Sequence, residues 1–136
     1  GLTVGYATFH DNEVSGSDSE TNDKFFATYK VLPNMGVFVT LEDLEVVNSF
    51  KASSGTDGQI DTYGIHYSMG IADIQLVHAD GDADSASANE DYKTNSISAT
   101  VNLSKHSDIT IGYTKQDFDA DGSDKSSTVV GLTHKF

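Results

Sequence analysis

Polar and apolar residues alternate along most of the chain, which is the period of a β-strand with two different faces. No segment keeps a helical period, and no apolar run approaches the roughly 20 residues of a membrane helix. The pattern therefore predicts an all-β protein, with a single domain over residues 1–136. Eight strands are predicted, over residues 2–10, 24–32, 36–47, 59–68, 70–79, 92–103, 109–116 and 126–136.

The links between these strands alternate in length. Three are short, at 33–36, 68–70 and 104–108, and the first contains the turn-forming pair Pro33 and Asn34. The other four are longer and rich in Asp, Ser, Gly and Asn, at 11–23, 48–58, 80–91 and 117–125. Short turns at one end and long loops at the other predict antiparallel strands in up-and-down order, as in outer-membrane barrels.

One face of each predicted strand is apolar, and the other is polar or small. The tyrosines of the apolar face lie near strand ends, as in the aromatic girdles of membrane barrels. A soluble β-sandwich has the same period, so periodicity alone leaves both architectures open. The apolar face comprises Leu2, Val4, Tyr6, Phe25, Ala27, Tyr29, Val31, Val37, Val39, Leu41, Tyr63, Ile65, Tyr67, Ala72, Ile74, Leu76, Ile97, Ala99, Val101, Leu103, Ile109, Ile111, Tyr113, Val130, Leu132 and Phe136.

Charge separates the two architectures. The chain has 8 Lys and no Arg against 21 acidic residues, a formal net charge of −13, which argues against nucleic acid as a partner. Of the acidic residues, all but Asp73 and Asp108 lie at the predicted long-loop end. Charges excluded from a central belt are what a membrane imposes. The absence of Cys leaves no disulfide or thiolate metal site.

The end of the chain, Val130-Gly131-Leu132-Thr133-His134-Lys135-Phe136, resembles the closing strand of Gram-negative outer-membrane porins. In that family a terminal Phe with apolar or aromatic residues at alternate positions is recognised by the barrel-assembly machinery. The resemblance gives this role to Val130, Leu132, His134 and Phe136. It also implies a barrel of about sixteen strands, of which this chain is the C-terminal half, and a homotrimer in contact with lipid and lipopolysaccharide.

The function expected from the resemblance is passive diffusion of small hydrophilic solutes through a water-filled channel, with long acidic loops outside and short turns and C-terminus in the periplasm. The acidic mouth should favour cations. The alternative is a complete eight-stranded barrel with a filled interior and a structural or surface-binding role. The expected pore-lining residues are Thr28, Lys30, Thr62, His66, Asp73, Gln75, Ser96, Ser98, Thr100, Thr114 and Lys135.

Two further patterns suggest chemistry. Asp117, Asp119 and Asp121 precede Gly122 with the spacing of a calcium loop, but position twelve is Thr128 rather than Glu, so solvated acidic loops are the better interpretation. His10 and His78 stand beside acidic residues at the predicted rim, an arrangement found in hydrolases, but no nucleophile signature supports catalysis. No enzyme activity and no cofactor are expected.

Overall fold

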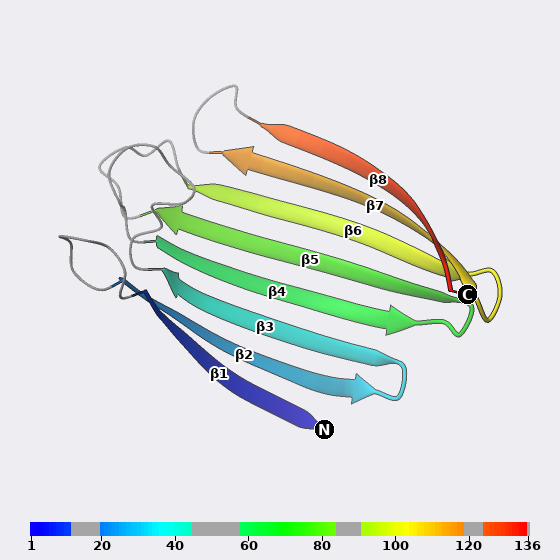
Figure 1. Ribbon diagram of the computed structural model, residues 1–136, viewed down its shortest axis with the longest axis horizontal. Coiled ribbons are helices and arrows are strands. Elements are labelled where there is room, and N and C mark those ends of the chain that lie inside the picture. The colour runs from blue at the N-terminus through cyan, green and yellow to red at the C-terminus, as the bar shows by residue number, and fades with distance from the viewer. Residues whose placement is uncertain (12–19, 45–57, 84–90, 119–123, 136) are drawn as a thin grey trace.

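A computed structural model of the chain describes residues 1–11, 20–44, 58–83, 91–118 and 124–135. It contains eight strands, as the alternation predicts (Figure 1). Among the described residues no helix is long and apolar enough to cross a membrane. The strands are β1 (Leu2–Asp11), β2 (Glu20–Leu32), β3 (Met35–Leu44), β4 (Gly58–Ser68), β5 (Ala72–Ala83), β6 (Tyr92–Asn102), β7 (Ser107–Phe118) and β8 (Lys125–His134).

All eight strands form one antiparallel sheet in the order of the chain, which confirms the all-β, up-and-down prediction. Each strand pairs with the next through seven antiparallel ladders, from β1 with β2 to β7 with β8. β1 and β8 do not pair with each other, so the sheet is open and has two free edges (Figure 1). The closed eight-stranded barrel of the alternative is therefore not the form that these strands adopt.

The three short turns lie together at one end of the sheet, as predicted (Figure 1). In the turn between β4 and β5, Gly70 has a φ of 84°, a conformation that costs glycine little and other residues much. The prediction that the fifth strand begins at 70 is wrong by two residues, because this left-handed glycine belongs to the turn and pairing starts at Ala72.

At the opposite end the strands are longer than predicted. β2 begins at Glu20 rather than 24, β5 continues to Ala83 and β7 to Phe118, so Asp23, Asp80, Asp82 and Asp117 lie in the ladder and not in loops. Backbone hydrogen bonds do not require apolar side chains, and a side chain on an uncovered face can carry charge at no cost of burial. Residues 45–47, assigned to the third strand, lie outside the described residues.

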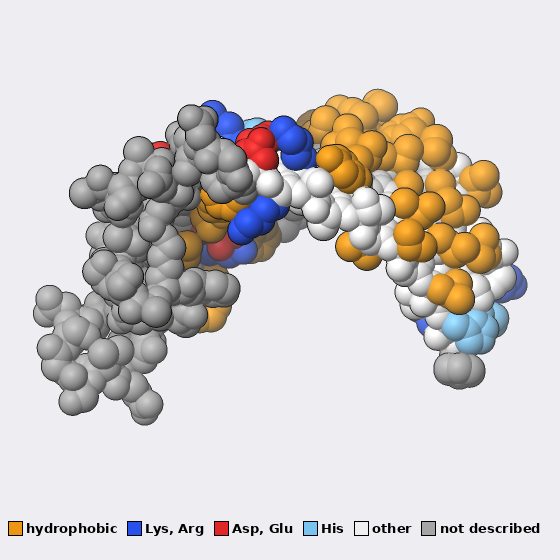
Figure 2. Space-filling model, turned by 90° about the horizontal axis from the view of Figure 1, so that it is seen from above, with side chains coloured by type: hydrophobic (Ala, Val, Ile, Leu, Met, Phe, Trp, Pro, Cys, Tyr) orange, Lys and Arg blue, Asp and Glu red, His pale blue; other side chains and the backbone are white. Residues whose placement is uncertain are grey.

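Register settles which side chains share a face, because directly opposed residues in an antiparallel ladder point the same way. The predicted apolar face is continuous across all eight strands, for example through Val37, Ile65, Leu76, Ile97 and Tyr113. The sheet is curved into an arch, and its hydrophobic side chains gather on the outer, convex side toward the turn end (Figure 2). We call this the convex face and the other the concave face.

The arch has a single layer, so its described part has almost no interior. Ala72, at 9% exposure, is its one buried hydrophobic residue. No second sheet or helix covers either face in the described ranges. The large side chains of the convex face are therefore exposed or half-buried, and form an apolar surface that no described element covers.

The concave face is less uniformly small and polar than predicted. Phe26, Phe38 and Tyr92 also project from it, each directly opposite a glycine on the neighbouring strand: Gly5, Gly64 and Gly81 respectively. A Cβ at any of these glycines would overlap the facing ring. The rings therefore lie flat over backbone that carries no side chain, an arrangement known to stabilise glycines in sheets.

This packing predicts that Gly64→Ala destabilises the sheet by about 1–3 kcal/mol, because the Phe38 ring must leave its position. The free energy of unfolding, from denaturant titration of the refolded protein, measures the loss. Gly131→Ala is the matched control, since a Cβ there meets nothing within 4 Å. In the double variant Phe38→Ala/Gly64→Ala the two losses should be less than additive; full additivity would contradict the proposed contact.

Candidate functional site

The convex face carries a continuous apolar band, which we define by the side chains at the end of this paragraph. Val37, Val39, Ile74 and Ile109, inside the sheet, are half-buried, whereas exposure reaches 66% at Leu2 and 72% at Val130, on the free edges. The edge side chains lack a neighbour on one side. The band consists of Leu2, Val4, Tyr6, Phe25, Ala27, Tyr29, Val37, Val39, Leu41, Tyr63, Ile65, Tyr67, Ile74, Leu76, Ile97, Ala99, Val101, Ile109, Ile111, Tyr113, Val130 and Leu132.

Aromatic residues mark the upper limit of this band, the limit toward the long-loop end of the strands. On four strands its last members are Tyr6, Phe25, Tyr63 and Tyr113. The Tyr6 hydroxyl donates a hydrogen bond to Asp23 Oδ1 (2.7 Å), and the Tyr63 hydroxyl donates one to Asp61 Oδ2 (3.2 Å). Each of these two rings thus rests on the apolar band while its hydroxyl reaches the polar zone beyond it. Tyrosine takes this position at a boundary between apolar and aqueous surroundings.

The band crosses the strands obliquely. Tyr6, its upper limit on β1, is in register with Asp61 and Asp80 on the central strands, where the band has already ended. Between β1 and β8 the upper limit descends by about six residues, roughly 20 Å, over a sheet width of roughly 34 Å, from the usual strand rise and spacing. A level boundary therefore requires strands tilted by about 30°, close to the tilt of membrane barrels.

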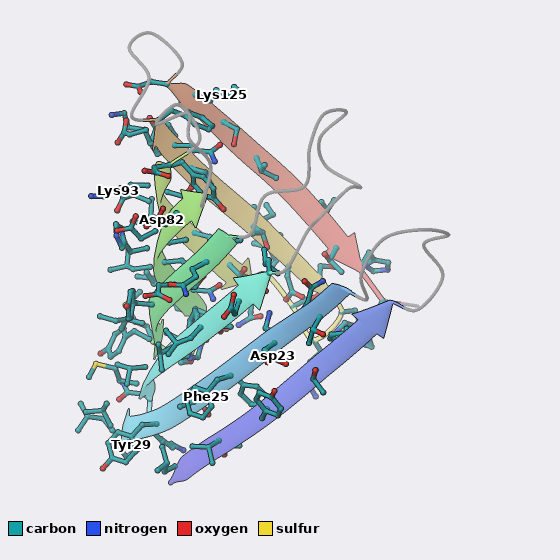
Figure 3. All side chains as sticks on the ribbon, turned by 90° about the vertical axis from the view of Figure 1, so that its left-hand side faces the viewer. Asp23, Phe25, Tyr29, Asp82, Lys93 and Lys125 are labelled. Carbon is teal, nitrogen blue, oxygen red and sulfur yellow. The ribbon has the colours of Figure 1, made fainter. Side chains whose placement is uncertain are left out.

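Above the band the convex face carries an acidic belt, comprising Asp23, Asp43, Asp61, Asp80, Asp82 and Asp117. Lys93 Nζ lies 3.9 Å from Asp80 Oδ2, and Lys115 forms an ion pair with Asp117. Figure 3 follows the change along β2, where Asp23, Phe25 and Tyr29 succeed one another from the loop end to the turn end. The convex face is thus divided into an apolar zone toward the turn end and an acidic zone toward the long-loop end.

The concave face carries the residues predicted to line a pore. The register places ten of the eleven on this face: Thr28, Lys30, Thr62, His66, Asp73, Gln75, Ser96, Ser98, Thr100 and Thr114. Lys135 follows β8, and its backbone N–H donates to the carbonyl of His106 (2.8 Å). The sequence therefore predicted the shared face of the strand residues correctly.

Hydrogen bonds between neighbouring strands order the hydroxyls of the concave face. Ser96 Oγ lies 2.9 Å from Thr114 Oγ1, and Thr100 Oγ1 lies 2.9 Å from Thr110 Oγ1. These pairs form a polar surface on β6 and β7 that is compatible with water. Such a wall is chemically unlike the apolar band on the other side of the same strands.

Positive and negative charges nearly balance among the described side chains of the concave face. Lys24 Nζ is paired with Glu42 Oε1 at 2.7 Å, and His66 Nε2 lies 3.5 Å from Asp73 Oδ1. The Lys125 ammonium lies 5.1 Å from the centroid of the Phe118 ring, within reach of a cation–π interaction. The sequence predicts that nearly all carboxylates lie at the long-loop end, but it does not assign them to a face of the sheet. The structure places the six carboxylates of the acidic belt on the convex face.

The remaining candidates are dispersed. His10 pairs through its backbone with Thr21 at the edge of the sheet, whereas His78 lies on β5 with Nδ1 at 2.9 Å from Asn95 Oδ1, so the two are not brought together. Asp119 and Asp121 lie outside the described residues, and within the described ranges no three His, Asp or Glu side chains come together as a metal site requires.

The predicted assembly signal is divided. Val130 and Leu132 belong to the apolar band on the free edge strand. His134 lies on the same face, with Nδ1 at 2.8 Å from Ser107 Oγ. Phe136 lies outside the described residues. The signal therefore remains a prediction from the sequence.

Comparison with protein-family models, curated proteins and solved structures found no match to this chain.

Proposed function

We propose that the chain forms part of a porin-like channel in a bacterial outer membrane, through which small hydrophilic solutes and ions diffuse. The observation that carries this proposal is the apolar band on the convex face of a sheet whose concave face is mostly polar or small. At roughly 25 cal/mol per Å², exposing such an apolar surface to water is costly. The hydrocarbon of a membrane would remove it from water without any further protein. In a membrane barrel the polarity is inverted in this way.

Two features favour lipid over a second protein layer as the cover. The tyrosine hydroxyls at the upper limit of the band reach into the acidic belt, as expected at a membrane interface. The oblique course of the band also becomes level when the strands tilt, as they do in barrels. A second protein layer would require neither an aromatic limit nor a level boundary.

The free edges support a barrel larger than the described sheet. A strand edge exposed in hydrocarbon would leave its N–H and C=O groups unsatisfied, so β1 and β8 need further strands beside them. A total of about sixteen strands would enclose an aqueous lumen, whereas eight would leave room only for side chains. The proposed orientation puts the long loops outside the cell and the acidic belt at the level of the lipopolysaccharide headgroups. Assembly by the barrel machinery and trimer formation belong to the same proposal.

Thiol accessibility tests the proposal directly, because the chain contains no Cys of its own. Ile97 and Ser98 are neighbours on β6 that face opposite sides of the sheet. A charged methanethiosulfonate should modify Ser98→Cys and reduce its single-channel conductance in a planar bilayer, while leaving Ile97→Cys unmodified. Equal modification of both variants, or the absence of any conductance from the unsubstituted protein, would reject the channel.

The cost of a buried charge tests the lipid contact. Leu76→Lys should reduce the free energy of unfolding from lipid vesicles by about 2–4 kcal/mol, because it puts an ammonium among acyl chains. Gln75→Lys is the matched control, one residue away on the concave face, and should change stability little. Circular dichroism during denaturant titration follows both. A similar small change in both variants would mean that water, not lipid, covers the band.

We further propose that the channel prefers cations, with carboxylates at the long-loop mouth as the cause. The acidic belt should contribute little, since it faces away from the lumen. Asp61→Asn/Asp80→Asn should therefore leave the reversal potential in a KCl gradient unchanged. Glu42→Gln, which removes the partner of Lys24 on the concave face, should shift it toward anions, more at low salt than at high salt. A larger shift from the belt variant than from Glu42→Gln would contradict this assignment.

A further inference from the structure

A hollow of about 460 Å³ lies on the concave face near the turn end of β2, β3 and β4. Two rows of concave side chains bound it. Thr3, Thr28 and Phe38 form one row, and Lys30, Gly36 and His66 form the other. Leu2, Tyr29 and Val37, which belong to the row between them, and Gly1 complete the lining.

Gly36 creates the space in this hollow. It stands between Lys30 on β2 and His66 on β4 in direct register, so these two side chains are separated by two strand spacings, roughly 10 Å, with no side chain between them. A Cβ at Gly36 would meet only the Tyr29 carbonyl oxygen, at 3.6 Å. The backbone would therefore accept a larger residue, and its absence leaves the hollow open.

The chemistry of the lining is that of a site for an anion. The ammonium of Lys30 makes no ion pair or hydrogen bond with any described side chain, whereas the concave Lys24 is paired with Glu42. The hydroxyls of Thr3 and Thr28 can donate hydrogen bonds on one side, and on the other side lies the imidazole of His66, whose Nε2 is 3.5 Å from Asp73 Oδ1. The Phe38 ring, held flat over Gly64, offers an apolar surface beside these donors.

We propose that this hollow is a solute subsite for small organic carboxylates that carry an apolar part. Lys30 pairs with the carboxylate, the Thr28 hydroxyl donates a hydrogen bond to it, and the apolar part rests on Phe38. The subsite rests on the proposed channel function and deepens it, because it lies on the wall that the solute would pass. It would slow carboxylates locally in a channel whose other mouth favours cations.

Benzoate is the probe, and its neutral isostere benzamide is the control ligand. In planar bilayers benzoate should reduce the open-channel current in a saturable manner, and benzamide should not. Lys30→Gln should weaken the block by about fivefold, the size expected for one ion pair in a site open to water. Gly36→Leu should abolish the block by filling the hollow. Gly112→Leu is its matched control, since Gly112 lies in the same row across the sheet and a Cβ there has a similar nearest contact, at 3.6 Å.

Binding of benzoate to the refolded protein in detergent micelles, measured by calorimetry, separates the two proposals. If the protein conducts but benzoate binds the unsubstituted protein, Lys30→Gln and Gly36→Leu equally, or does not bind, the subsite is wrong and the channel stands. If benzoate binds with the expected dependence on Lys30 and Gly36 but no conductance occurs, the channel is wrong and the subsite is a surface site. An equal effect of Gly112→Leu and Gly36→Leu would also overturn the assignment to this hollow.

Discussion

The structure depends on one constraint: a single-layer sheet has no core of its own. Its interior strands pair with neighbours on both sides, with one irregularity between Lys30 and Leu32, so backbone hydrogen bonding needs no second layer. The hydrophobic contribution to stability is not complete, since no large apolar side chain in the described residues is buried and most of those on the convex face are exposed. Whatever covers that face supplies the stabilisation that a globular protein obtains from its interior.

The register turns this requirement into geometry. Because the apolar band descends across the sheet while the pairing stays in direct register, a flat apolar cover can match the band only if the strands tilt. The concave face depends on register as well. On that side the rings of Phe26 and Phe38 occupy the space that a Cβ at Gly5 or Gly64 would take.

The alternation predicted much of the fold from the sequence alone. Period two is a property of the strand itself, so the faces of neighbours such as Gln75 and Leu76 follow without knowledge of their partners. The upper strand ends did not follow. Asp80 and Asp82 resemble a loop by composition, and only the pairing of β5 with β4 and β6 makes them strand residues. The space at Gly36 could not be predicted from the sequence either. It lies between Lys30 and His66 only because the register places these residues of neighbouring strands beside Gly36.

Charge shows why position along a strand and direction from it must be distinguished. Along the chain the carboxylates sort by end, which suggested a single acidic mouth. Within the sheet, carboxylates at nearly the same position along the strands point to opposite faces. Asp61 and Asp80 lie on the convex face. Glu42, which pairs with Ile60, lies on the concave face. The formal net charge of −13 therefore does not describe the concave face alone, because the six carboxylates of the acidic belt point away from it. In the proposed channel, the field that a permeating ion experiences would depend mainly on the concave side chains, because these lie nearest to its path.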